Sequence, residues 1–264
     1  MKEFFMYLIT QWWGVTIICV LIVSVWLLLS ALLYKPFFKR FYDVVLSALA
    51  LLVLSPVLLL LIVLGAIKMK GNPFFTQLRP GKIDKKTGKE RIFRLIKLRT
   101  MTNERDENGE LLPDEKRLTK YGKFLRSTSL DELFELINIF KGDMSIVGPR
   151  PQLVRDMVFM DETQRKRHKV CPGLTGLAQV KGRNNITWEQ KFEYDLEYVE
   201  KITLWKDLKI VFATAWKVLK RSDVAREGTV SDIDFGDWLL QEGKISNDFY
   251  NAKQRMSKEY IKEH

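Results

Sequence analysis

The sequence predicts an α+β protein, mainly helical, that is attached to a membrane. Residues 1–67 are dominated by two long apolar runs, whereas the following residues alternate charged loops with helical and strand-like patterns. The chain of 264 residues is also long enough to bury one sizeable core. We therefore expect an N-terminal membrane helix, a Pro-kinked re-entrant membrane helix, and a small cytoplasmic globular domain with a short β-hairpin and amphipathic interfacial helices.

The first apolar run extends from Met6 to Leu33, which exceeds the roughly 20 residues needed to cross a bilayer. Aromatic residues of the kind that anchor a helix at a membrane surface accompany it: Trp12, Trp13, Trp26 and Tyr34. A cleaved signal peptide is disfavoured, because the first residues are barely basic and no clear cleavage site follows. Residues 1–38 are thus predicted to form a membrane segment and a basic linker, with the N-terminus outside.

The second apolar run, residues 41–67, has basic residues on both flanks. Basic flanks tend to stay in the cytoplasm, so a helix that crosses the membrane would force one of them outside. Ser55 and Pro56 lie in the middle, and a proline there kinks the helix. A kinked helix that enters and leaves on one face satisfies both observations, and an ordinary kinked transmembrane helix is the alternative.

The globular part is predicted to span residues 39–221, including the second membrane helix. Strands are expected at 74–79 and 91–97 around a turn at 84–89, with helices at 130–140, about 152–168 and 187–201. A last helix carries an apolar stripe from Leu208 to Leu219 framed by lysines, which suits either an anionic membrane surface or packing on the core. Residues 222–264 are predicted to be a polar C-terminal tail.

Charge is concentrated in the middle of the chain. The net charge is +11, the first 34 residues are neutral, and the tail from Ser222 has nine acids and six bases, so residues 35–221 carry +14. This field attracts nucleic acid, anionic lipid or nucleotide phosphates, and charge alone does not rank them. The two cysteines do not make a disulfide framework. His168 stands in a basic run and is interpreted as a solvated or structural residue in preference to a general base.

The adjacent acids Asp131 and Glu132 are the candidate reactive groups. One interpretation is structural, because Ser129 and Glu132 match a capping box at the start of a helix. The other is chemical, because an aspartate can attack phosphorus and a neighbouring carboxylate can hold Mg²⁺. Basic residues nearby would neutralise phosphate: Arg126 precedes the pair, and Arg150 is fixed between two prolines. Lys97 could serve the same purpose or lie on a solvated strand face.

These residues fall in six ordered segments that resemble the bacterial sugar transferases, the small monotopic phosphoglycosyl transferases. The resemblance covers about Lys39 to Arg221, and no single segment would carry it alone. The segments are Lys39-Arg40-Phe41-Tyr42-Asp43, Ser55-Pro56, Lys97-Leu98-Arg99-Thr100-Met101, residues 126–133, residues 141–151 and Pro172-Gly173-Leu174-Thr175-Gly176, the last extended to Asn184.

The resemblance implies an Mg²⁺-dependent enzyme of the bacterial cytoplasmic (inner) membrane, with its catalytic domain on the cytoplasmic face. Such an enzyme moves a sugar-1-phosphate from a UDP-sugar to polyprenyl (undecaprenyl) phosphate and releases UMP, the first membrane step of glycoconjugate assembly. It implies that Asp131 is the nucleophile and Glu132 the Mg²⁺ ligand. The implied ligands of phosphate and nucleotide are Lys97, Arg126, Arg150, Arg183 and Asp207.

The resemblance also implies that the helix with Ser55 and Pro56 is re-entrant. Overall similarity favours an N-acetylated amino sugar, although the sequence does not identify the sugar. Homodimerisation and docking to downstream glycosyltransferases stay open, and no nucleic-acid partner is expected. Two rival functions remain: a membrane-tethered protein that binds nucleic acid or anionic lipid, and a phosphatase that acts on lipid phosphates.

Overall fold

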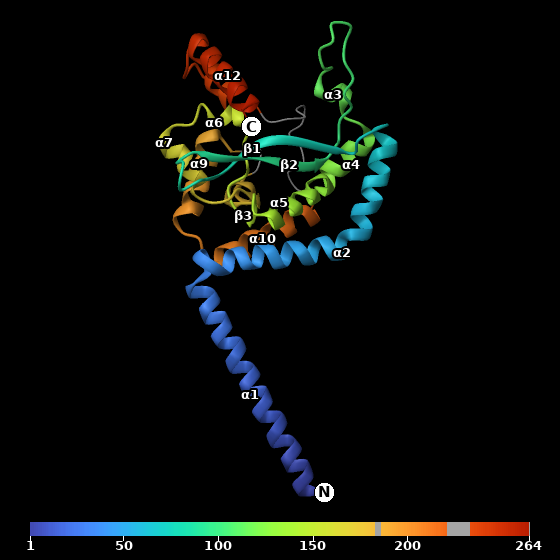
Figure 1. Cartoon of the computed structure of the whole chain (residues 1–264), viewed down its shortest axis with the longest axis vertical. Coiled ribbons are helices and arrows are strands. Elements are labelled where there is room, and N and C mark those ends of the chain that lie inside the picture. Colours follow the sequence, from blue (N-terminus) through green and yellow to red (C-terminus); the bar gives the residue numbers. More distant parts are fainter. Residues whose placement is uncertain (183–185, 221–232, 264) are drawn as a thin grey trace.

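The computed structural model describes residues 1–182, 186–220 and 233–263. A long helix, α1 (Lys2–Leu32), extends away from a globular body, and the π-helical turn Tyr34–Phe38 joins it to α2 (Lys39–Lys68) (Figure 1). Two stretches are long and apolar enough to cross a membrane by length and composition: Trp12–Leu32, with mean hydropathy 2.8, and Tyr34–Lys68, with mean hydropathy 2.9. Most of their large apolar side chains are exposed, as expected for a membrane-associated protein.

Helix α2 contains Pro56 and turns sharply, running beneath the body and then along its side (Figure 1). Proline cannot donate to the carbonyl four residues earlier, which belongs to Leu52. The Ser55 hydroxyl donates to that carbonyl instead, at 2.7 Å. The Ser55-Pro56 pair therefore bends the helix and still gives the released acceptor a partner.

Both halves of α2 contact the same globular body. In the first half, Arg40 donates to the carbonyl of Ile139 at 2.6 Å, and Asp43 accepts from the backbone N–H of Ile146 at 2.9 Å. In the second half, Leu58 and Leu61 are buried in a cluster with Leu98 of the hairpin and with Leu125 and Phe134 further along the chain. The two ends of α2 are thus tied to one side of the protein.

The predicted hairpin is present and longer than expected. Strands β1 (Phe74–Ile83) and β2 (Glu90–Leu98) are antiparallel, and the turn closes where the Asp84 N–H donates to the Lys89 carbonyl at 2.9 Å. A second sheet pairs β3 (Ser145–Val147) with β4 (Gly173–Thr175) in parallel. The sequence did not predict β3 and β4, because three residues are too few to establish an alternating pattern.

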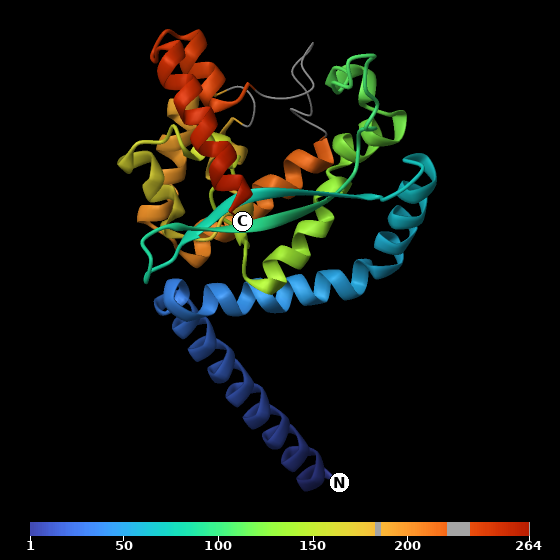
Figure 2. The ribbon, with the colours of Figure 1, turned by 45° about the horizontal axis from the view of Figure 1, so that its top comes forward.

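Short helices surround the hairpin, which lies across them in Figure 2. In chain order they are α3 (Asp114–Arg117), α4 (Lys120–Thr128), the 3₁₀ turn η2 (Leu130–Phe134), α5 (Glu135–Lys141), α6 (Val154–Met157), α7 (Glu162–Arg165), the 3₁₀ turn η3 (Lys166–Lys169), α8 (Leu177–Lys181), α9 (Trp188–Glu200) and α10 (Leu204–Lys220).

Two helix predictions have opposite outcomes. The helix expected at 187–201 is confirmed as α9, and Thr187 and Gln190 form a capping box at its start. The single helix expected at about 152–168 is wrong, because α6, α7 and η3 occupy that segment. Helix α6 ends at Met157, and Asp161, whose backbone is extended, caps α7 through its side chain, so that a separate helix starts there.

Residues 233–263 pack on the body, although the sequence predicted a polar tail. They form α11 (Phe235–Gln241) and α12 (Asn247–Lys262). Phe235 is 2% exposed, and its ring centroid lies 5.0 Å from that of Phe192 and 5.1 Å from that of Trp188. A few large apolar side chains at one end are thus enough to dock a mostly polar segment.

A buried acid fastens the hairpin to η3. Glu90 is fully buried, accepts hydrogen bonds from the Arg165 guanidinium and lies 3.0 Å from Nδ1 of His168. Burial lowers the pKa of His168 and so favours the neutral ring, and the contact with Glu90 gives this residue a structural role. Burial alone would raise the pKa of Glu90, but the bonds from His168 and Arg165 lower it to about 2.

Replacing Glu90 by Gln should therefore destabilise the fold in a pH-dependent way. Its depressed pKa contributes stability above the ordinary carboxyl pKa, and that stability is lost as the pH falls towards about 2. We expect Glu90→Gln to lower the free energy of unfolding by about 3 kcal/mol near neutral pH. Thermal unfolding in detergent should show that the difference in stability between the unmodified protein and Glu90→Gln becomes smaller below about pH 4.5. As a control, replacement of the exposed Glu189 by Gln should change the free energy of unfolding by no more than about 0.5 kcal/mol. An equal loss of stability in both variants would contradict the stabilising role assigned to buried Glu90.

Candidate active site

Asp131 and Glu132 lie on the 3₁₀ turn η2, between α4 and α5. The capping box predicted for Ser129 and Glu132 is wrong. Ser129 has φ 55° and ends α4 in the left-handed conformation, and its side chain makes no capping bond. Positive φ is uncommon for a residue other than glycine, and here it occurs at the left-handed end of α4. The tight turn leaves the Glu132 side chain available for other partners.

Asn138 sets the distance between this turn and the hairpin. Its side-chain carbonyl accepts from the Ile96 N–H at 3.1 Å, and its amide donates to the Arg94 carbonyl at 2.8 Å. The side chain thus pairs with β2 much as a neighbouring strand would, and it fixes α5 against that strand. Lys97, the next residue of β2, is thereby directed towards the acids of η2 and α5.

Glu132 is the centre of the charge cluster. Its Oε1 accepts from Lys97 Nζ at 2.8 Å and from an Arg150 guanidinium nitrogen at 2.8 Å. Its side chain is 17% exposed. Burial by itself would raise the pKa of Glu132, but Arg150 and Lys97 outweigh it and hold the pKa below its usual range. Arg150 does form an ion pair, and its partner is one of the two candidate catalytic acids.

A third acid, Glu135, belongs to the same cluster and was missed by the sequence analysis. Its Oε1 lies 3.0 Å from Lys97 Nζ, and its side chain is 3% exposed. Burial first, and then the charge of Glu132, raise the pKa of Glu135 to about 7. The available signal was spacing, because an acid three residues after Glu132 lies on the same side of a helical turn.

Asp131 is partly buried and, among the described residues, forms no ion pair. Burial and the neighbouring charge of Glu132 raise its pKa, while Lys97 and Arg126 act in the opposite direction. Arg126 stands in the last turn of α4, where its Nε donates to the Thr100 hydroxyl at 3.2 Å. The two acids therefore differ: Glu132 is held by two cations, whereas no cation among the described residues holds the Asp131 carboxylate.

The loop that carries Arg150 is held from behind by two other arginines. Arg167 donates to the Arg150 carbonyl at 2.7 Å and is itself buried in an ion pair of 2.6 Å with Asp195. Arg79 donates to the Pro151 carbonyl at 3.0 Å. The proline on each side of Arg150 further restricts the backbone. The Arg150 guanidinium is thus presented on a stiff support.

Of the remaining predicted site residues, the structure places Asp207 elsewhere. Asp207 is 4% exposed and accepts from Tyr34 at 2.7 Å, Lys39 at 2.7 Å and Tyr198 at 2.9 Å. It makes no contact with Lys97, Glu132 or Arg150, so its predicted role in binding phosphate gains no support from the fold. It instead joins the start of α2 to α9 and α10. Arg183 lies outside the described residues.

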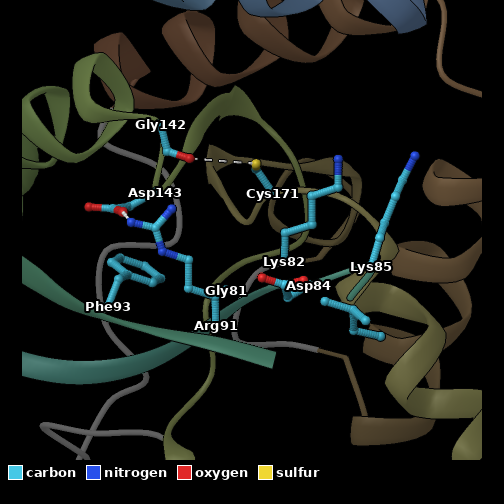
Figure 3. A pocket seen from close by; sticks show the side chains of 10 residues that line it. Gly81, Lys82, Asp84, Lys85, Arg91, Phe93, Gly142, Asp143 and Cys171 are labelled. Carbon is cyan, nitrogen blue, oxygen red and sulfur yellow. Dashed lines mark hydrogen bonds and ion pairs between the residues drawn. The ribbon is translucent and has the colours of Figure 1, made fainter. Parts of the chain in front are cut away.

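A cavity of ≈ 270 Å³ lies at the other end of the hairpin, where Lys82 and Lys85 extend side by side (Figure 3). It contains none of the predicted site residues. Its two acids have partners, since Asp84 accepts from the Lys86 N–H at 2.6 Å and Asp143 lies 3.6 Å from Arg91. We assign the chemistry to the acid pair and not to this cavity.

The acid pair is compatible with Mg²⁺. Over the described residues, no group of three or more His, Cys, Asp or Glu could enclose a metal. Mg²⁺, however, is commonly bound by one or two carboxylates together with substrate phosphates and water. Both hydrogen bonds to Glu132 fall on Oε1, and Oε2 accepts none among the described residues. Glu132 Oε2 and the adjacent Asp131 carboxylate therefore fit an ion that arrives with a phosphate.

Among the described residues, a carboxylate without an ion pair, that of Asp131, thus lies beside the Glu132 carboxylate held by Lys97 and Arg150, in a body fastened to the long apolar helix α2. The family model described as "Bacterial sugar transferase" matches residues 34–221. The chain therefore belongs to the bacterial sugar transferase family, and the resemblance seen in the sequence is confirmed.

The relatives of this chain include a protein of comparable length and others that are much longer. A sugar transferase of Bacillus subtilis, EpsL, itself described as uncharacterized, is 44% identical over 73% of this chain and 93% of its own length. The UDP-glucose:undecaprenyl-phosphate glucose-1-phosphate transferase of Klebsiella pneumoniae is 40% identical over 68% of this chain and 40% of its own length. The undecaprenyl-phosphate galactose phosphotransferase of Salmonella typhimurium is 35% identical over 70% of this chain and 41% of its own length.

Proposed function

We propose that this protein transfers a sugar-1-phosphate from a UDP-sugar to a polyprenyl phosphate, releasing UMP. The proposal rests on the different environments of the two acids. Lys97 and Arg150 fix Glu132, whereas Asp131 has no ion pair among the described residues. The names of two relatives, which refer to undecaprenyl phosphate and a hexose, support the same reaction class.

In the first half-reaction, a carboxylate oxygen of Asp131 attacks the phosphorus that carries the sugar. A phosphorus–oxygen bond forms to Asp131, the bond to the bridging oxygen breaks, and UMP leaves with that electron pair. Lys97 and Arg150 lie where they offset negative charge as it develops on the leaving phosphate. Mg²⁺, held by Glu132 and the substrate phosphates, would supply further positive charge when bound.

In the second half-reaction, a phosphate oxygen of the polyprenyl acceptor attacks the same phosphorus. The bond to Asp131 breaks, the carboxylate is regenerated, and the product is a polyprenyl-diphospho-sugar. A single nucleophile therefore serves both steps, and no separate base is needed because the attacking oxygen is already anionic.

The apolar surface supports a reaction at a membrane interface. The exposed side chains of α2 and those of α10, among them Trp205, Phe212 and Trp216, are suited to lipid. We propose that α2 is re-entrant, because both of its halves are fastened to one body and Ser55-Pro56 bends it between them. The catalytic body would then face the cytoplasm of a bacterial inner membrane.

The re-entrant form predicts that both ends of α2 lie on the same side of the membrane. In a variant whose native Cys19 and Cys171 are replaced by Ala, cysteines introduced at Lys35 and at Lys68 should react with an impermeant maleimide only after cells are permeabilised. A reporter at Lys258 in α12 should behave identically, whereas one at Glu3 should react in intact cells. Labelling of positions 35 and 68 from opposite sides would exclude the re-entrant form.

The proposed reaction is tested by incubating purified protein with Mg²⁺, undecaprenyl phosphate and a panel of UDP-sugars, and measuring UMP. The panel should include UDP-N-acetylated amino sugars, which the resemblance favours, and the UDP-glucose and UDP-galactose suggested by the relatives' names. Release of inorganic phosphate from the lipid without a nucleotide sugar would indicate a phosphatase. Salt-sensitive binding of nucleic acid without turnover would indicate a binding protein.

A further inference from the structure

Arg79 is a cation of the site region with no assigned role in the chemistry. In the hairpin register, Gln77 lies opposite Leu95 and Phe75 opposite Lys97. Side chains directly opposite one another, and those two residues apart on a strand, share a face of the sheet. Arg79 is therefore on the Lys97 face of the hairpin, two residues beyond Gln77, and it is only partly exposed.

The Arg79 guanidinium has hydrogen-bonding capacity to spare. One terminal nitrogen donates to the Pro151 carbonyl at 3.0 Å, and the other donates to the Gln77 side chain at 2.7 Å. A guanidinium has five N–H donors, so three are uncommitted, and the buried Nε has no partner in the described part of the chain. Both acceptors are neutral, and Arg79 has no ion pair within the described residues.

Arg150 is a second cation close to Arg79. Burial first, and then the charge of Arg150, lower the pKa of Arg79 to about 10. Glu132 contacts Arg150, whereas the acid whose charge acts most strongly on Arg79 is Asp156. The Asp156 carboxylate accepts from the backbone N–H groups of Leu153 and Phe235 and forms no ion pair with Arg79. A partly buried guanidinium without an ion pair among the described residues, next to the exposed Arg150, favours an additional anion, and the forked donor geometry of arginine matches phosphate oxygens.

We propose that Arg79 binds the nucleotide-side phosphate of the UDP-sugar, next to the phosphate that Arg150 and Lys97 offset. This inference rests on the proposed function. Arg150 contacts Glu132, and Arg79 contacts the residue after Arg150, so Arg79 lies one step further from the acid pair along the Pro-bounded loop. A diphosphate that extends from Asp131 past Arg150 would place its second phosphate at Arg79. That phosphate leaves as part of UMP.

The test compares Arg79→Gln with Arg94→Gln. Arg94 is an exposed arginine on the opposite face of the same hairpin, so Arg94→Gln removes the same charge at a distance from the site. For Arg79→Gln we expect the KM for the UDP-sugar and the inhibition constant of UMP each to rise by about 10- to 100-fold, the loss of one or two charge-assisted hydrogen bonds. The KM for undecaprenyl phosphate should not change, and uridine, which has no phosphate, should bind both proteins equally weakly.

Other outcomes would overturn the inference. If Arg79 only supports the Arg150 loop, the variant will lose kcat while the donor KM and UMP inhibition stay at their original values. A raised KM for the lipid acceptor alone would assign Arg79 to the other substrate. Arg79→Lys keeps the positive charge and one donor for the Pro151 carbonyl, so it serves as a control for misfolding. The inhibition constant of UMP should be several-fold lower in Arg79→Lys than in Arg79→Gln.

The inference and the proposed function fail separately. Absence of UMP release by the unmodified protein would remove the proposed function. Calorimetric titration of UMP into the unmodified protein and into Arg79→Gln measures the phosphate contact without turnover. Equal UMP affinity in the two proteins would remove the inference and leave the reaction intact.

Discussion

Asp131→Asn is expected to abolish both UMP release and formation of the lipid-linked sugar. An amide oxygen is a poor nucleophile towards phosphorus, and the described cluster offers no second carboxylate that is free of ion pairs to replace it. We expect a fall in kcat of at least about 10³-fold, the scale seen when a nucleophile is removed. The variant should remain folded, because within the described residues the Asp131 carboxylate has no ion pair to lose.

A matched change tests whether any Asp to Asn replacement in a first helical turn would have this effect. Asp248 stands exposed in the first turn of α12, and Asp248→Asn should retain full activity. Mass spectrometry of protein quenched with UDP-sugar in the absence of acceptor should find a sugar-phosphate adduct on the peptide that contains Asp131, and none in the variant. Normal turnover by Asp131→Asn would show that the nucleophile has been misassigned.

Much of the architecture could be predicted from local pattern. The apolar runs, the hairpin and α9 follow from hydropathy, alternation and a capping box, and each of these signals lies within a few neighbouring residues. The broken segment at 152–168 shows the limit of such reasoning. One helix was expected there, but α6 ends at Met157, and the Asp161 side chain accepts from the Gln164 N–H and starts α7 as a separate helix.

The site was only partly accessible from sequence. Lys97, Arg150 and the acid pair were grouped by resemblance, and the structure brings Lys97, Glu132 and Arg150 into direct contact. The neighbours of Glu135 and Asp207 could not be foreseen, because both acids bond to residues far away in the chain. Asp207 accepts a hydrogen bond from Tyr34, which lies 173 positions earlier in the chain. Both of its carboxylate oxygens accept hydrogen bonds from partners that no local pattern identifies.

Glu132→Gln is expected to reduce kcat by about 10²- to 10³-fold and to weaken the dependence on Mg²⁺. Glutamine is neutral and keeps one acceptor oxygen, so Lys97 and Arg150 compete for it while the metal loses a charged ligand. The measurement is UMP release as a function of Mg²⁺ concentration, and the half-saturating concentration should rise by about tenfold or more.

Glu135→Gln provides the matched comparison, since Glu135 shares Lys97 with Glu132 but is buried behind it. Its loss should lower activity by no more than about tenfold, the scale of one weakened charge-assisted bond, and should leave the Mg²⁺ dependence unchanged. If Glu132→Gln and Glu135→Gln respond to Mg²⁺ alike, then Glu132 acts on the reaction only by holding Lys97 and Arg150 in place, and the metal must be bound by other groups.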